Sequence, residues 1–290
     1  MTKKISVIMC VYNNWAFLTD SINSILNQSF SNFEFIIIND GSNKITKKIL
    51  VNYKKKDERI ILINQKNIGL TLSLNKALKM SNSEFIARQD SDDISYKERF
   101  TEQIKLFNSN KKIILCGSFA DVINDKKQII KSLTNLPLEN LNIKKKLLHQ
   151  NTFIHSSTMY KLSAINKIGG YNNKFKYAQD YECWCRMSSE GDFANIPKKL
   201  IALRIHSESI SAKKSKEQNY YALKAQIFFN SKQIQNKKKF RNFKNVMYYL
   251  SRFDLKRKIS FSDLNLKEKI LLLKYPKLIT KFFLKKFLLR

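Results

Sequence analysis

Short apolar runs that alternate with amphipathic segments are the feature that most constrains how this chain can fold. Four runs have the length of a buried strand and are followed by polar residues: 5–11, 33–38, 60–63 and 84–87. Three segments between them carry apolar residues at helical spacing: 17–26, 45–53 and 70–80. Strand and helix in this order predict an α/β fold, with a parallel sheet covered by helices. Ligands of such sheets bind at the carboxyl ends of the strands, so polar residues there are the first candidates for a site.

The second half of the chain is less regular. The pattern predicts a helix over 96–108, a strand over 113–116, and turns at 136–137, 169–170 and 196–197. The composition changes near residue 213. Residues 213–290 hold 22 Lys or Arg against 4 Asp or Glu, a net charge of +18 (22 − 4), with a single proline and no glycine. We expect a folded domain over 1–212 and a basic helical extension over 213–290.

The sharpest candidate for a functional site is the acidic run at residues 88–93, Arg-Gln-Asp-Ser-Asp-Asp, directly after the fourth apolar run. Asp90, Asp92 and Asp93 place like charges side by side, and their repulsion must be offset. A divalent cation does this, and hard oxygen ligands spaced one residue apart suit Mg²⁺ or Mn²⁺ that bridges to a diphosphate. A solvated acidic turn that caps the following helix is the alternative, and the run alone does not choose between the two.

Two further polar turns follow the second and third predicted strands. Residues 39–42, Asn-Asp-Gly-Ser, put Asp40 at a strand end, where its carboxylate could accept from the imide N–H of uracil or form an ordinary Asp-Gly turn. Asn67 opens the segment 67–70, which is either a loop close to a phosphate or a plain helix start. Each signal is weak alone, but a parallel sheet brings all three turns to one edge.

The order of these segments resembles the inverting family 2 glycosyltransferases of the GT-A fold, a Rossmann-like, mostly parallel sheet flanked by helices. The likeness spans about residues 4–211. Its motifs are, in family order, 6–13, 39–42, the DXD region at 88–93, 169–171 with 179–186, and the closing segments 195–197 and 204–211.

The resemblance implies a role for each residue that matches a family motif. The residues it implies at the donor nucleotide are Val11, Tyr12, Asp40, Asn67, Arg88 and Asp90. Asp40 would contact uracil, Asp90 the ribose or the metal, and Asp92 the metal, Mn²⁺ or Mg²⁺, beneath the donor diphosphate. The backbone of residues 11–12 would line the base pocket.

The same resemblance assigns Asp180 the role of general base. An acceptor hydroxyl is a poor nucleophile near neutral pH, so a carboxylate must take its proton, which is worth roughly 10²–10⁴ in rate. A divalent cation would stabilise the departing UDP. Displacement from the opposite face inverts the anomeric carbon, so an α-linked donor would give a β-linkage. This chain departs from the family with Cys10 in place of a common proline and with Gln179 in place of a glutamate.

Several side chains of the later motifs have more than one possible role. Trp184 could stack on the acceptor sugar, but a Trp at helical spacing favours the core. Arg186 could contact the diphosphate, although a surface charge is the preferred interpretation. His206 could be the third protein ligand of the metal, bind a phosphate oxygen, or be structural. The histidines expected to be structural or to face the acceptor are His149 and His155.

The charge of the chain raises a competing function. Lys and Arg total 54 against 23 Asp and Glu, a formal net charge of +31, which attracts polyanions and anionic membranes. A nucleic-acid-binding protein is therefore the alternative, but the cations concentrate in the extension, and the acidic run would repel phosphates without a metal. A sugar-phosphate nucleotidyltransferase would carry an early glycine-rich loop, whereas the first glycine is Gly41.

The extension and the cysteines bear on where the protein acts. Aromatic and leucine residues alternate with cations over 274–290, which favours a helix in a membrane interface; packing of its apolar face on the folded domain is the alternative. No stretch reaches the roughly 18 apolar residues of a spanning helix. The four cysteines form no CxxC pair and are expected to pack in a reducing cytoplasm. We expect a cytoplasmic enzyme that is peripheral on the inner face of the membrane. It would transfer a hexose or N-acetylhexosamine from a UDP-sugar. The acceptor would be a glycan or a lipid-linked molecule of the lipopolysaccharide or capsule type.

Overall fold

The structure is a computed structural model, which describes residues 3–236. Its first compact unit runs from Met1 to Phe229 and a second from Asn230 to Arg290. The predicted division at residues 212 and 213 stays a prediction, and the predicted membrane-interface helix at 274–290 lies outside the described residues. Among the described helices, none combines the length and apolar character that a membrane span requires.

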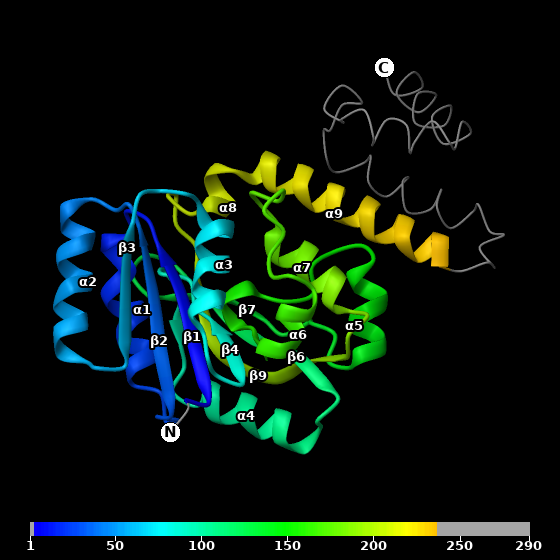
Figure 1. The fold of residues 1–290 in the computed structure, drawn as a ribbon, viewed down its shortest axis with the longest axis horizontal. Coiled ribbons are helices and arrows are strands. Elements are labelled where there is room, and N and C mark those ends of the chain that lie inside the picture. Colours follow the sequence, from blue (N-terminus) through cyan, green and yellow to red (C-terminus); the bar gives the residue numbers. More distant parts are fainter. Residues whose placement is uncertain (1–2, 237–290) are drawn as a thin grey trace. The chain divides into compact units, whose positions relative to one another are not determined.

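The first half of the chain forms the parallel sheet predicted from its sequence. The strands are β1 (Ile5–Val11), β2 (Phe33–Asp40), β3 (Ile60–Gln65) and β4 (Phe85–Arg88), side by side in the order β3-β2-β1-β4. Their crossover helices are α1 (Trp15–Leu26), α2 (Lys44–Lys56) and α3 (Leu70–Met80). All three neighbouring pairs are parallel, so their carboxyl ends lie at one edge. The N-terminus lies at the opposite end of β1, at the bottom of Figure 1.

The second half continues the same sheet with mixed strand directions. Its strands are β5 (Ile94–Ser95), β6 (Ile113–Ile123), β7 (Ile129–Leu133), β8 (Met159–Lys161) and β9 (Asp192–Arg204). Strand β8 pairs antiparallel with both β4 and β6, and β6 pairs parallel with β9. Strand β5 pairs antiparallel with β9, and β7 pairs antiparallel with β6. The parallel rhythm therefore ends at β4, because β8 enters the sheet from a distant part of the chain.

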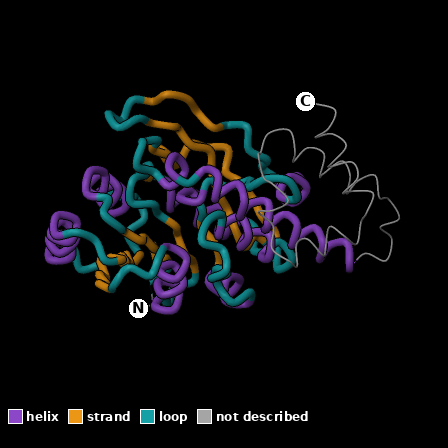
Figure 2. Tube along the Cα trace, turned by 90° about the horizontal axis from the view of Figure 1, so that it is seen from above, coloured by secondary structure: helices purple, strands orange, loops and turns teal. Residues whose placement is uncertain are grey.

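The second half contains six helices and one 3₁₀ turn among the described residues. They are α4 (Arg99–Ser109), α5 (Asn140–Leu147), the 3₁₀ turn η1 (His155–Ser157), α6 (Leu162–Lys167), α7 (Gln179–Met187), α8 (Ile210–Lys213) and α9 (Ser215–Asn236). Helices flank the strands when the molecule is seen from above (Figure 2). The turn predicted at 196–197 is wrong, because Pro197 lies inside β9. The pairing register of β6 and β9 shifts at this point. The proline, which has no N–H, therefore interrupts no regular hydrogen bond between the two strands.

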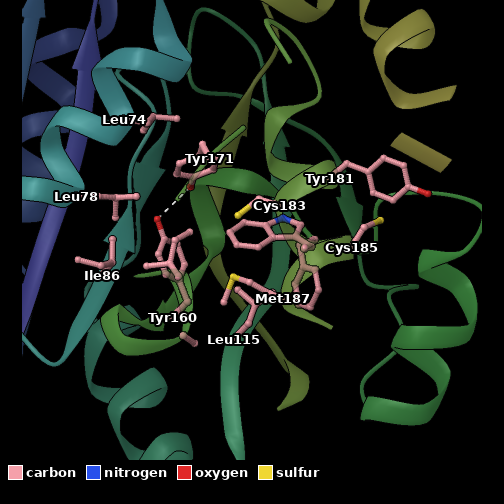
Figure 3. Packing of buried hydrophobic residues seen from close by; sticks show 14 of the residues in the cluster. Leu74, Leu78, Ile86, Leu115, Tyr160, Tyr171, Tyr181, Cys183, Cys185 and Met187 are labelled. Carbon is pink, nitrogen blue, oxygen red and sulfur yellow. Dashed lines mark hydrogen bonds between the residues drawn. The ribbon is translucent and has the colours of Figure 1, made fainter. Parts of the chain in front are cut away.

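The core has two parts, one on each face of the sheet, since successive residues of a strand point to opposite faces. On one face Ile8 packs with Ile36 and Leu74, and on the other Val7 packs with Phe35. The first cluster continues into the second half of the chain through aromatic and sulfur side chains. Figure 3 shows this region, with Tyr160, Tyr171, Tyr181, Cys183, Cys185 and Met187 together.

Candidate active site

The loops after β1 and β2 are joined by hydrogen bonds at the carboxyl edge of the sheet. The backbone N–H of Asn13 donates to Ser42 Oγ at 3.1 Å, and Asn13 Oδ1 accepts from the N–H of Asn43 at 2.7 Å. Ser42 Oγ donates in turn to the carbonyl of Val11 at 3.2 Å. These bonds hold Val11 next to the Asp40 turn, and Tyr12 is 57% exposed; that the two line a base pocket stays a prediction.

Asp40 is buried and uses both carboxylate oxygens to hold the loop before α3. Oδ1 accepts from Gln65 Nε2 at 2.8 Å and from the N–H of Ile68 at 2.9 Å, while Oδ2 accepts from the N–H of Gly69 at 2.9 Å. A carboxylate oxygen can accept two hydrogen bonds, so Oδ2 retains one acceptor position. The predicted contact with uracil stays a prediction.

Asn67 is exposed in the same loop, close to the glycine that follows Asp40. Gly41 has a φ of +76°, and a Cβ there would lie 2.7 Å from the backbone nitrogen of Asn67. Only glycine lets these two turns approach so closely. The structure thus brings Val11, Tyr12, Asp40 and Asn67 to one edge of the sheet, as the sequence predicts.

The three aspartates of the acidic run have different environments. Asp93 is 1% exposed and accepts from Ser156 Oγ and from the N–H of Arg204, the latter at 2.8 Å. Burial and the charges of Asp92 and Asp90 raise the pKa of Asp93 well above its usual range. Asp93 therefore joins the loop after β4 to η1 and to β9, and it is structural.

Asp92 meets His206, as the predicted metal pair requires. His206 Nε2 lies 3.0 Å from Asp92 Oδ2, although 114 positions separate the two residues. The histidine ring packs on Phe17 with centroids 4.7 Å apart, and the guanidinium of Arg204 lies 4.4 Å from the centroid of the same phenyl ring. Arg204 Nε also donates to the carbonyl of Asp92 at 2.9 Å. Helix α1 and the end of β9 therefore fix the pair at the sheet edge.

Asp90 accepts a hydrogen bond from the buried side chain of Arg88. The guanidinium of Arg88 is fully buried and donates to Asp90 Oδ1 and to the backbone carbonyls of Ile8 and Gln89. Burial is the largest single influence and opposes the charged form, but the charge of Asp90, together with the effects of Cys10, Tyr171 and Tyr160, outweighs it, and the pKa of Arg88 is raised. Arg88 is thus placed to orient Asp90 from inside the protein, and its direct contact with a ligand stays a prediction.

Arg99 is a buried residue that donates hydrogen bonds to the first two residues of the 88–93 run, although no motif of the sequence marks it. Its guanidinium is fully buried and donates to the side chains of Gln89 and Ser95 and to the carbonyls of Arg88 and Thr158. Burial lowers its pKa to about 9. No local pattern distinguishes Arg99 from the solvated cations of an amphipathic helix, so only the fold reveals this role.

Asp180 is the second residue of α7 and is half-buried. Its Oδ2 accepts from Asn151 Nδ2 at 2.7 Å. His155 links it electrostatically to the acidic run, because His155 Nδ1 lies 4.0 Å from Asp90 Oδ2 and the charges of Asp90 and Asp180 both act on the ring. Burial and the charge of Arg88 outweigh these carboxylates and lower the pKa of His155. The predicted base and the acidic run therefore both act on His155, and that they form one site stays a prediction.

The remaining expectations have separate outcomes. Trp184 is fully buried among Phe153, Tyr160 and Tyr171, so the core interpretation is confirmed. The preferred surface position of Arg186 is wrong. Its side chain is 20% exposed, pairs with Glu182, and donates to the carbonyls of Ile168 and Gly170. The planar guanidinium has five N–H donors, and two of its nitrogens donate to these carbonyls after the end of α6. A side chain that pointed into solvent could not make these bonds.

The other histidines and the cysteines are mostly internal. His155 is partly buried beside Tyr171, with 3.3 Å between Nε2 and the phenol oxygen, and the carbonyl of His149 accepts from Gln226. Cys116, Cys183 and Cys185 are buried free thiols. Burial raises the pKa of Cys116 to about 12, which is consistent with packing and not with reactivity.

The two side chains that could hold a metal here are those of Asp92 and His206. Within the described residues no group of three or more His, Cys, Asp or Glu side chains could hold an ion. Asp92 and His206 offer one carboxylate oxygen and one imidazole nitrogen, whose side chains are 23% and 7% exposed. Mg²⁺ and Mn²⁺ sites that also use a diphosphate and water often have only one or two protein ligands. The donor set therefore fits such an ion.

Comparisons with known proteins agree with this geometry. The family model described as Glycosyl transferase family 2 matches residues 6–169. The O-antigen biosynthesis glycosyltransferase WbnJ of Escherichia coli is 35% identical over 210 residues, which cover 71% of this chain and 81% of that protein.

Two solved structures share the fold. TarS of S. aureus, residues 1–349 in complex with UDP-GlcNAc, superposes with a TM-score of 0.64 at 15% identity, covering 87% of this chain and 80% of that chain. The mannosyltransferase PcManGT from Pyrobaculum calidifontis, in complex with GDP-Man and Mn²⁺, gives 0.61 at 14% identity, covering 88% and 71%. The predicted GT-A fold is confirmed.

Proposed function

The chain belongs to glycosyl transferase family 2 and is a glycosyltransferase, and from this premise we propose that it is a metal-dependent, inverting enzyme that uses a UDP-sugar. It would transfer a hexose or an N-acetylhexosamine to a hydroxyl of a growing cell-surface glycan. One observation carries the proposal: Asp92 and His206 meet at 3.0 Å on the strand edge that also holds Asp40. The family membership favours an enzyme over the nucleic-acid-binding protein considered from the charge.

The donor nucleotide would lie over the loops after β1, β2 and β3. Asp40 would accept the imide N–H of uracil at the position left on Oδ2, with Val11 and exposed Tyr12 along the base and Asn67 near the phosphates. The UDP-GlcNAc bound by TarS supports a uridine nucleotide. A carboxylate acceptor in this place selects an imide N–H, which cytosine lacks.

Asp92 and His206 would hold Mn²⁺ or Mg²⁺, and Asp90 would contact the ribose or the same cation. When bound, the cation would neutralise the negative charge that grows on the departing UDP. Arg88 keeps Asp90 Oδ1 engaged from inside the protein, so Oδ2 is the oxygen left for a ligand. The Mn²⁺ in the PcManGT complex supports a divalent ion at such a site.

Asp180 would act as the general base. It would take the proton of the acceptor hydroxyl while that oxygen attacks C1 of the sugar from the face opposite UDP. Inversion at C1 follows, so an α-linked donor gives a β-linked product. His155, neutral because burial lowers its pKa, lies between this base and the acidic run without adding a competing positive charge.

The acceptor would be a glycan or a lipid-linked oligosaccharide met at the cytoplasmic membrane surface. The name of WbnJ, an O-antigen biosynthesis enzyme, supports this class. The charge of residues 213–290, 22 Lys or Arg against 4 Asp or Glu, would attract anionic lipids and keep the enzyme on the inner face of the membrane.

A donor screen tests the proposal. UDP-, GDP- and TDP-sugars are incubated with the full chain and Mn²⁺, and release of the nucleotide is measured. We expect release from UDP-sugars and its loss with a chelator. Equal release from GDP-sugars would refute the uridine contact of Asp40, and release that persists with the chelator would refute the metal. UDP with Mn²⁺ should also raise the melting temperature, whereas duplex DNA should not.

A further inference from the structure

Asn151 lies directly beside the proposed base, although it belongs to none of the motifs that identify the family. Its Nδ2 donates to Asp180 Oδ2 at 2.7 Å, and its Oδ1 accepts from the N–H of Phe153 at 3.1 Å. Because both ends of the amide are engaged, its orientation is determined. Among the described residues no hydrogen bond reaches Asp180 Oδ1, so this oxygen is the one left to take a proton.

The segment that carries Asn151 is itself held at two backbone carbonyls. The hydroxyl of Tyr181, from α7, donates to the carbonyl of Leu147 at 2.7 Å. Gln226 Nε2, from α9, donates to the carbonyl of His149 at 2.6 Å, and Gln226 is only 1% exposed. Gln226 lies well beyond residues 6–169, which the family model matches. Helix α9 therefore reaches the segment next to the base.

We propose that Asn151 is a positioning residue that orients the carboxylate of Asp180, and that Gln226 anchors the segment from which it does so. The inference rests on the proposed role of Asp180. A general base needs a third group that fixes its direction, since proton abstraction requires hydrogen-bond contact with the attacking hydroxyl. Asn151 supplies this direction through Oδ2, and the first part of the basic extension thereby belongs to the catalytic apparatus.

The surroundings of Asp180 make the amide at position 151 important. The charge of Asp180 acts on the pKa of three neighbouring groups, His155, Cys183 and Cys185. Burial lowers the pKa of His155 and raises the pKa of both thiols, so all three are neutral near pH 7. A carboxylate introduced at position 151 would lie at hydrogen-bond distance from Asp180, and the two would compete for one proton.

The chain offers a closely matched control in Asn140. Its Nδ2 donates to Asp192 Oδ1 at 2.7 Å, and its Oδ1 accepts from the N–H of Phe193 at 3.1 Å. Asn140 thus makes the same two bonds as Asn151, to an aspartate outside the site. Replacing either residue by alanine should lower the melting temperature to a similar extent, but only Asn151→Ala should change catalysis.

The test measures nucleotide release with Mn²⁺ from whichever UDP-sugar is fastest in the donor screen, together with the melting-temperature shift caused by UDP and Mn²⁺. We expect Asn151→Ala to lower kcat roughly 10-fold to 100-fold through misplacement of the base, with the UDP-induced shift unchanged. Gln226→Met should lower kcat in the same direction by less. Asn151→Asp should move the acid limb of the pH–rate profile to higher pH, which a merely structural role would not do.

The outcomes separate this inference from the proposed function. In an Asp180→Asn background, Asn151→Ala should cause no further loss, since it acts through that carboxylate. Parental kcat and an unmoved pH profile in both Asn151 variants, with activity abolished by Asp180→Asn, would overturn the inference and leave the base intact. If Asp180→Asn itself keeps near-normal turnover, the proposed base is wrong. An equal loss of kcat in Asn140→Ala would reduce Asn151 to a stability effect and also overturn the inference.

Discussion

Replacing Asp92 by asparagine should remove the metal-dependent part of donor binding and leave the fold intact. The side chain is 23% exposed, and within residues 3–236 its one side-chain partner is His206 Nε2 at 3.0 Å. Asparagine can keep a hydrogen bond to the imidazole, but its neutral amide is a poor ligand for a hard divalent cation. We therefore expect little change in the melting temperature of the ligand-free protein.

The size of the expected effect follows from ligand linkage and from the compact unit Met1–Phe229. Free ligand at about 100 times its Kd stabilises the folded state by about 2.7 kcal/mol. A domain of this size shifts by about 2–4 °C for each kcal/mol. UDP with Mn²⁺ should therefore raise the melting temperature of the parent by roughly 5–11 °C. Asp92→Asn should keep only the part that UDP produces with a chelator.

Thermal unfolding followed by circular dichroism is the assay, with UDP in the presence of Mn²⁺ or of a chelator. Asp20→Asn is the matched control, because Asp20 is also a partly exposed carboxylate, 28% exposed, and pairs with Lys127 and Arg204. The control should retain the full Mn²⁺-dependent shift. If Asp92→Asn retains it as well, the assignment of Asp92 as a metal ligand is refuted.

Three further predictions concern the base, the buried acid and the buried cation. Asp180→Asn should lower nucleotide release from a UDP-sugar roughly 10²–10⁴-fold and keep the UDP-induced melting shift; near-parental turnover would contradict the role of Asp180. In metal-free protein the raised pKa of Asp93 means that the folded state binds a proton more tightly than the unfolded state, so the free energy of unfolding should fall as pH rises above about 4, by at most about 1.4 kcal/mol per pH unit. Urea unfolding at several pH values checks this, and Asp93→Asn should flatten the slope; a slope equal to that of the parent would count against it. Arg99 donates five hydrogen bonds, one of them to the side chain of Gln103, and a lysine has only three donors. Arg99→Lys should therefore lower the free energy of unfolding by about 2–6 kcal/mol, since two buried hydrogen bonds are lost at about 1–3 kcal/mol each. The control Arg59→Lys, at a partly exposed ion pair, should cost less than about 1 kcal/mol, and equal losses in urea unfolding would refute the role of Arg99.

The parallel half of the sheet was predictable because its signals are local. Each of its strands is a short apolar run that is followed by polar residues, and each crossover helix shows its own apolar face. The second half lacks this property. Strand β8 is only three residues long, Met159–Lys161, and it pairs with β4 and β6, which are far away in the sequence. Such pairings are set by long-range packing that no window of the sequence contains.

The site divides in the same way. The acidic run and the turn at Asp40 are recognisable because several polar residues follow one another at a strand end. Asn151 and Arg99 are single polar residues in segments of ordinary composition, so nothing local marks them. Arg186 was expected at the surface, because a charged residue near the end of a short helix is usually solvated, yet the turn after α6 supplies it with carbonyl partners.

The amino-acid order by itself determined the α/β class, the edge of the sheet where the polar turns collect, and the carboxylates that crowd there, since hydrophobic periodicity and clustered charge act over a few neighbouring residues. Only the folded chain decided which aspartate is buried as a structural link, which one meets His206, and which amide donates to Asp180. Those roles depend on desolvation and on contacts between residues as much as 114 positions apart, and both exist only after the strands have paired.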